Sequence, residues 1–302
     1  MFLSLKNALG RPYLSFVGLL DSFSGASAAY SLRKLSSSYT GNAVRIRRVS
    51  DDVEVDVGFS GNSVSTSSPI TNVSGDGGDT SATTLGGFIT EGGNQDATVT
   101  TWYDQSGNSR NAPQSTTGEQ PKIASSGVLE TDANGKPTLL FDGTDDDLDL
   151  PTTVMSSLDS VSAFNVCSSS DTSGTKIALG LSRTQGSAKR HYLPVQSSTQ
   201  FFHNYDTPFA PAGQKLADAD TNQHLFSSVA GSSTAKGFFD GTEKFSQSSV
   251  STYASNREGG IGSSDGGTNW QGDISEIIIY NSDQTSDFDA INTEIKSHYG
   301  IS

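Results

Sequence analysis

AVRIRRVSDDVEVDVGF, residues 43–59, is the stretch that decides the fold class. Apolar and polar side chains alternate over 44–47 and again over 53–57, as in antiparallel strands that are buried on one face. Further bursts of apolar and β-branched residues follow, separated by Gly, Ser, Asn and Asp, at 99–103, 138–141, 161–167, 177–181, 224–229, 237–239 and 274–280. Short strands at this spacing predict a sandwich or a barrel rather than βαβ units.

Two helices are expected beside the strands. The first covers residues 24–35, SGASAAYSLRKL, which contain good helix formers. The second lies near the C-terminus, where apolar residues recur at helical spacing: Phe288, Ile291, Ile295 and Tyr299. Ser286 and Asp289 are placed to form a capping box at its start, and Gly300 is placed to end it.

The composition excludes several classes of protein. Acidic residues outnumber Lys and Arg by 33 to 19, so the net charge is −14, and neither nucleic acid nor an anionic membrane surface is expected as a partner. Only 17% of residues are charged and 33% are hydrophobic, which argues against a helical bundle. The single cysteine, Cys167, excludes an internal disulfide framework, and no apolar run is long enough for a membrane span.

The first 22 residues, MFLSLKNALGRPYLSFVGLLDS, are unusually apolar. They make a poor signal peptide, because Lys6, Arg11 and Pro12 interrupt the apolar residues and no positive charge precedes them. One interpretation is an edge strand packed on its own domain. The other, which we adopt, is an anchor over 1–22 that docks a domain of residues 23–302 onto a larger assembly.

Several longer segments carry a family resemblance. Residues 23–59, with a Tyr-Thr-Gly turn and an Arg-rich strand, together with TWYDQSGNSRNAPQ at 101–114, resemble the catalytic β-sandwich of arabinofuranosidase B-type glycoside hydrolases. LLFDGTDDDLDL at 139–150, GFFDG at 237–241 and GDISEIIIYNS at 272–282 resemble the laminin-G/concanavalin-like sandwich. The whole layout also resembles bacteriophage tail and fibre proteins. These resemblances imply an all-β, two-sheet concanavalin-like jelly-roll sandwich with a short N-terminal and a C-terminal helix.

The arabinofuranosidase resemblance implies a pair of carboxyl groups, one nucleophile and one acid/base. GIGSSDG at 260–266 resembles the acid/base turn, so Asp265 is the acid/base candidate. The nucleophile strand is expected near 192–202, YLPVQSSTQFF, which has no Asp or Glu; the nearest carboxylate, Asp206, lies beside Pro208. Without an anionic nucleophile no covalent glycosyl intermediate forms by the usual route. The sequence therefore predicts a sandwich that has kept its architecture and lost its reaction.

Sugar-binding sites combine aromatic rings with Asp and Asn side chains. Trp270 lies in a Gly/Asn/Gln-rich turn, and we expect it to contact carbohydrate together with Asp265, Asp104 and Tyr103. The alternative is that these aromatic side chains belong to the core.

The densest acidic cluster consists of Asp142, Asp145, Asp146, Asp147 and Asp149. Calcium takes several carboxylate and carbonyl oxygens from a loop, so Asp142, Asp145 and Asp147 are candidate Ca²⁺ ligands. The alternative is a solvated acidic turn between two strands. No other cofactor is expected.

Taken together, these features favour a bacteriophage virion structural protein: a fibre, spike or decoration component. Residues 1–22 would bind other virion proteins, and a non-catalytic sandwich would face outward toward a host surface glycan. Such appendages are symmetric homo-oligomers, and a trimer is expected. Two alternatives remain open: an arabinofuranosidase-type glycoside hydrolase that uses Asp265, and a lectin-like carbohydrate-binding module that uses Trp270.

Overall fold

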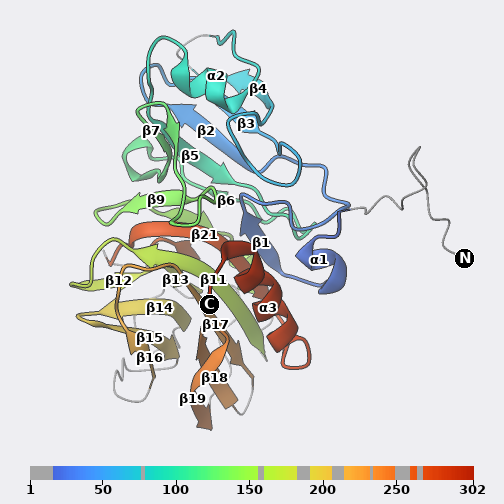
Figure 1. Cartoon of the computed structure of the whole chain (residues 1–302), viewed down its shortest axis with the longest axis vertical. Coiled ribbons are helices and arrows are strands. Elements are labelled where there is room, and N and C mark those ends of the chain that lie inside the picture. The colour runs from blue at the N-terminus through green and yellow to red at the C-terminus, as the bar shows by residue number, and fades with distance from the viewer. Residues whose placement is uncertain are drawn as a thin grey trace, which may run out of the picture.

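The computed structural model describes residues 16–75, 79–155, 160–181, 191–205, 214–231, 234–248, 259–263 and 268–302. The described strands form two antiparallel sheets, and the few helices lie around them (Figure 1). The predicted all-β, two-sheet sandwich is therefore confirmed.

The larger sheet runs the length of the molecule. Its order is β19 (Thr242–Ser248), β18 (Thr234–Phe239), β17 (His224–Ala230), β11 (Val161–Ser169), β21 (Gln271–Tyr280), β9 (Leu139–Asp142), β7 (Lys122–Ser125), β5 (Ala97–Trp102), β2 (Val44–Arg48), β3 (Glu54–Val57) and β4 (Ile70–Ser74). Three short strands pair beside this path: β1 (Ala28–Ser31) on β21, β6 (Ala112–Pro113) on β5 and β8 (Val128–Leu129) on β7.

The smaller sheet lies against one part of the larger one. Its order is β10 (Leu148–Leu150), β20 (Gly259–Ile261), β13 (Leu179–Gly180), β14 (His191–Ser197), β15 (Gln200–Tyr205) and β16 (Lys215–Asp218), with β12 (Thr175–Ile177) paired to β14. The main core fills the space between the sheets. Phe141 and Ile274 of the larger sheet and Leu179, Leu193 and Ile261 of the smaller one are all buried in it.

The C-terminal helix α3 (Phe288–Tyr299) covers part of the outer face of the larger sheet (Figure 1). Its apolar stripe, Phe288, Ile291, Ile295 and Tyr299, packs in a second cluster with side chains of β11, β17 and β21. The predicted helix is confirmed, and Gly300 ends it with a φ of +68°. The predicted capping box is wrong, because Asp287 is the N-cap residue and no side chain caps the helix start.

The predicted helix over residues 24–35 is also wrong. Residues 28–31 form β1, which pairs with Glu276–Ile279 of β21. All four residues are buried, and the side chains alternate between two faces: Ala28, Tyr30 and Leu32 enter the main core, whereas Ala29 joins the cluster under α3. The side chains of β1 are buried on both of its faces, and this packing outweighs the helix propensity of the alanines. The short N-terminal helix is instead α1 (Leu19–Ser22), whose Leu19 and Leu20 are buried in the α3 cluster.

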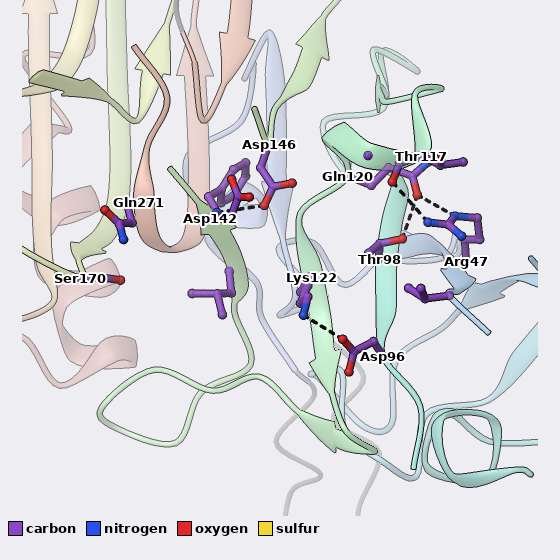
Figure 2. A pocket seen from close by; sticks show the side chains of 14 residues that line it. Arg47, Asp96, Thr98, Thr117, Gln120, Lys122, Asp142, Asp146, Ser170 and Gln271 are labelled. Carbon is purple, nitrogen blue, oxygen red and sulfur yellow. Dashed lines mark hydrogen bonds and ion pairs between the residues drawn. The ribbon is translucent and has the colours of Figure 1, made fainter. Parts of the chain in front are cut away.

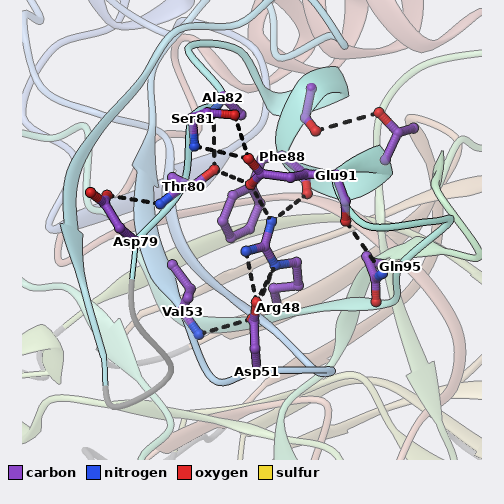
Figure 3. Close-up of polar contacts among 12 residues, drawn as sticks. Arg48, Asp51, Val53, Asp79, Thr80, Ser81, Ala82, Phe88, Glu91 and Gln95 are labelled. Carbon is purple, nitrogen blue, oxygen red and sulfur yellow. Dashed lines mark hydrogen bonds and ion pairs between the residues drawn. The ribbon is translucent and has the colours of Figure 1, made fainter.

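A third helix, α2 (Leu85–Thr90), is fixed to β2 by Arg48 (Figure 3). The Arg48 guanidinium pairs with Asp51 at 2.7 Å and with Glu91 at 2.8 Å, and it lies 4.6 Å from the centre of the Phe88 ring. Asp51 and Glu91 therefore neutralise the positive charge of Arg48 within the fold. Within the described residues, one-turn helices are also formed by η1 (Thr117–Glu119) and η2 (Thr152–Met155).

Candidate glycan-binding groove

The part of the larger sheet's outer face that α3 leaves open carries a polar row. Arg47 pairs in register with Thr98, Thr98 with Lys122, Lys122 with Leu140, and Leu140 with Asp273. Residues directly opposite each other in a sheet point to the same face. The row therefore crosses β2, β5, β7, β9 and β21, while alternate residues of these strands point into the core.

A groove of about 570 Å³ lies along this row (Figure 2). It is lined by Arg47, Val49, Asp96, Thr98, Thr117, Gly118, Gln120, Lys122, Leu140, Phe141, Asp142, Asp146, Ser170 and Gln271. Most of the lining residues carry polar side chains, but apolar atoms make up the larger part of the exposed lining, and Val49 and Leu140 contribute to it.

Gln120 organises one wall of the groove. Its Oε1 accepts hydrogen bonds from Arg47 Nε at 3.0 Å and Thr98 Oγ1 at 2.8 Å, and its Nε2 donates to the Gln114 carbonyl. Arg47 also pairs with Asp52 at 2.6 Å. These bonds fix the wall before any ligand arrives.

Lys122 is the reachable cation of the groove floor. Its Nζ lies 2.8 Å from Asp96 Oδ2, and this contact raises the lysine pKa, so the ammonium group stays charged. The side chain remains 42% exposed and has three donors. It can therefore donate to a ligand without giving up Asp96.

Carboxyl groups gather at the other end of the groove. One oxygen each from Asp142, Asp145 and Asp146 lie within 4.8 Å of one another. Asp142 and Asp145 are exposed, whereas Asp146 is buried and accepts a hydrogen bond from the Asp142 amide at 2.9 Å. Burial, with added repulsion from Asp142, raises the pKa of Asp146 to about 7. Asp146 therefore holds a proton over much of the pH range in which an ordinary aspartate is ionised.

The predicted calcium ligands are only partly brought together. Asp142 and Asp145 are neighbours, but their third partner is Asp146 and not Asp147. Asp147 instead accepts hydrogen bonds from Ser263 Oγ at 2.7 Å and from the Gln114 side chain. The three neighbouring carboxyl groups have the oxygen chemistry that Ca²⁺ prefers, and calcium binding stays a prediction.

Asp104 and Tyr103 do not line the groove. Asp104 is buried, and its carboxylate accepts hydrogen bonds from the amides of Ala29, Ser106 and Arg110, which fasten β1 to the turn after β5. The Tyr103 hydroxyl donates to Asp56 at 2.7 Å. The hydrogen bonds of both side chains serve the fold.

Trp270 is fully buried in the core between the sheets. Its indole N–H points at the carbonyl oxygens of Ser168 and Asp273, at 3.2 and 3.3 Å. No face of the ring is open to a sugar in this structure. Trp270 therefore belongs to the core, which was the alternative to a sugar contact.

The predicted catalytic candidate Asp265 lies outside the described residues, as does Asp206. The Gly-Ile-Gly motif before Asp265 has a structural reason. Gly262 has a φ of +83°, and a Cβ there would lie 2.3 Å from the Phe141 ring. The stretch 192–202 forms most of the hairpin of β14 and β15, without a carboxylate.

Sequence reasoning missed the groove residues Arg47, Thr98, Gln120, Lys122 and Gln271. The sequence did contain one indication of them, the polar residues at every second position of the alternating strands. These residues indicate that each strand has a polar face, but they do not indicate which strands are neighbours.

Comparison with solved structures identifies the architecture. A GH54 α-L-arabinofuranosidase soaked with a cyclic sulfate inhibitor aligns with a TM-score of 0.62 at 16% identity, over 91% of this chain and 63% of that one. An arabinofuranosidase complexed with arabinofuranosyl-α-1,2-xylobiose aligns with a TM-score of 0.58 over the same shares, also at 16% identity. The fold is a glycoside hydrolase-like β-sandwich. At this identity the likeness concerns the fold alone, and the chain spans less than two thirds of either structure's length.

No protein-family model matches the sequence, and no curated protein matches it. The predicted resemblance to the arabinofuranosidase sandwich is confirmed as a likeness of fold. The bacteriophage likeness, the virion location, the trimer and the docking through residues 1–22 stay predictions, and residues 1–15 lie outside the described part. Within that part, no helix is long and apolar enough to cross a membrane.

Proposed function

We propose that the protein is carbohydrate-active and that it binds a glycan chain in the groove of the larger sheet. The observation that carries the proposal is the groove itself, in which Lys122, Asp142 and Gln271 present donors and acceptors beside a wall fixed by Arg47, Thr98 and Gln120. A fold shared with an arabinofuranosidase that was solved in complex with arabinofuranosyl-α-1,2-xylobiose supports the choice of ligand class.

The chemistry of the groove suits a neutral, hydroxyl-rich ligand. Lys122 donates, Asp142 accepts, and the amide of Gln271 can do both. Val49 and Leu140 can pack against the C–H face of a sugar ring. The groove volume falls within the range of small-molecule sites, about 300–1,000 Å³, and its open sides leave room for a chain to continue.

The test is retention of the protein in a gel that contains arabinoxylan, together with calorimetry on an arabinofuranosyl-substituted xylooligosaccharide. We expect Lys122→Ala combined with Gln271→Ala to weaken binding at least tenfold. Lys236→Ala is the matched control, because Lys236 pairs with Glu243 at the same 2.8 Å and is similarly exposed, yet lies outside the groove. Full binding by the double variant, or no binding of either probe by the unaltered protein, overturns the proposal.

A second candidate function, glycoside hydrolysis, is favoured by the carboxyl groups of Asp142 and Asp146. Glycosidases use one protonated and one ionised carboxyl group on the two sides of the scissile bond. Asp146, with its pKa raised to about 7, would be the proton donor, and Asp142, which has a carboxyl oxygen within 4.8 Å, would be the second carboxyl group.

Release of 4-nitrophenol from 4-nitrophenyl α-L-arabinofuranoside measures this reaction. Loss of activity in Asp146→Asn supports Asp146 as the acid. Loss only in Asp265→Asn supports the acid implied by the sequence resemblance. Activity that survives both changes assigns the acid to another residue, whereas absence of activity in the unaltered protein argues for binding without cleavage.

A further inference from the structure

The connection between the two sheets ends at a histidine held by two carboxylates. Residues 219–223 lead from β16 of the smaller sheet to β17 of the larger one. His224 Nδ1 lies 2.7 Å from Asp240 Oδ2, and His224 Nε2 lies 2.9 Å from Asp220 Oδ1. The imidazole is largely buried, and its centre lies 4.3 Å from that of the Phe239 ring.

Each carboxylate is tied to a different element. Asp240 lies in the turn between β18 and β19; its Oδ1 accepts from the Leu225 amide at 2.9 Å, and its carbonyl accepts from Lys296 Nζ of α3 at 2.9 Å. Asp220 belongs to the connection, and it accepts from the amide and the side chain of Asn222 at 2.9 and 3.0 Å. His224 thus links the connection, β17, the β18–β19 turn and, through Asp240, the C-terminal helix.

Both links exist together only when the ring is protonated. An imidazolium donates from both nitrogens, whereas a neutral imidazole has one N–H. Burial lowers the pKa of His224, but hydrogen bonds and charge from Asp240 and then Asp220 outweigh it and raise the pKa above 6.5. The stabilisation is therefore complete below pH 6.5 and is lost as the pH rises through the folded-state pKa.

We propose that His224 is a pH-sensitive clamp: the protonated ring holds residues 219–223 against the β18–β19 turn, and loss of the proton releases the Asp220 end. The charged groups facing the ring are Asp220 on the connection and Asp240 on the turn, with Lys296 of α3 behind Asp240. Asp220 is the end that releases, because its side chain is 45% exposed, whereas Asp240 is 16% exposed and also holds the Leu225 amide.

The test follows the full chain between pH 5.5 and 8.5. NMR measures the His224 titration, and hydrogen exchange, corrected for intrinsic rates, measures the protection of amides 220–223. We expect protection to fall at high pH by about tenfold for each unit by which the His224 pKa exceeds 6.5. His224→Gln should remove this pH dependence. Asp220→Asn tests the same link at a more exposed position if the first variant folds poorly.

His298→Gln is the control, because burial lowers the pKa of His298 to about 4 and the ring is neutral throughout the range. That variant should keep the pH dependence of protection. A His224 pKa at or below 6.5, or protection of amides 220–223 that does not change with pH in the unaltered protein, overturns the clamp.

Discussion

Replacing Arg33 with Met is expected to destabilise the protein strongly, because the change leaves a carboxylate uncompensated in the interior. Arg33 Nε and Nη2 donate to the two oxygens of Glu276 at 2.7 and 2.8 Å, and Glu276 is 1% exposed at the centre of β21. The same guanidinium also donates to Glu294 of α3. One side chain thus joins the residues after β1, the central strand and the C-terminal helix.

The expected loss of unfolding free energy depends on which interactions Glu276 keeps after Arg33 is replaced. Removing one partner of a buried ion pair costs about 3–5 kcal/mol. Ser31 Oγ at 2.8 Å and the Tyr299 hydroxyl at 3.3 Å still donate to Glu276, so we expect a value of about 3 kcal/mol. Glu294→Gln is the comparison, because it loses only the half-exposed contact and should cost about 1 kcal/mol or less.

The pH dependence separates this mechanism from simple loss of packing. Burial raises the pKa of Glu276, but Arg33 outweighs burial and holds it below 4.5, so the native pair stabilises the fold above that pH and loses its effect under acid. In Arg33→Met, the hydrogen bonds from Ser31 and Tyr299 remain but the guanidinium is gone, so burial is opposed less and Glu276 takes up a proton more readily. The deficit in unfolding free energy, measured by urea denaturation, should therefore be smaller at pH 5 than at pH 7. A deficit below about 1 kcal/mol at pH 7, or one equal at both pH values, refutes the reasoning.

Three further predictions concern Asp146, calcium and Trp270. The pKa of Asp146 is raised from 3.8 to about 7, so the fold loses up to about 4 kcal/mol as the pH rises between these values; Asp146→Asn should flatten that loss in a pH series of thermal unfolding, and an unchanged slope would contradict it. If Ca²⁺ binds there, it should raise the melting temperature at pH 8 in the unaltered protein but not in Asp146→Asn. Trp270→Ala should cost about 3–5 kcal/mol in urea denaturation, whereas Trp270→Phe should leave arabinoxylan retention intact because no ring face is exposed. Retention lost in a folded Trp270→Phe protein would show that the indole does contact the glycan.

The strands were predictable because their pattern is local. In β2 and β3, alternation along a few residues already identifies the apolar side chains that enter the main core, and no distant information is needed. Residues 24–35 failed for the opposite reason. Their alanines favour a helix locally, but Ala28 and Ala29 are small enough to lie on both faces of a strand packed against β21, a partner some 250 residues away. Pairing with that partner, and not the local propensity, decides the conformation.

The groove could not be predicted because it is a product of strand order and register. Arg47, Lys122 and Gln271 become neighbours only once β2, β5, β7, β9 and β21 are placed side by side, and no spacing in the sequence specifies that order. The acidic loop shows the same limit at the scale of one residue. Asp146 and Asp147 are adjacent in the loop between β9 and β10, yet Asp146 lines the groove and Asp147 accepts a hydrogen bond from Ser263. Composition can therefore identify an acidic loop, but the folded path of that loop decides which carboxyl group can meet a ligand.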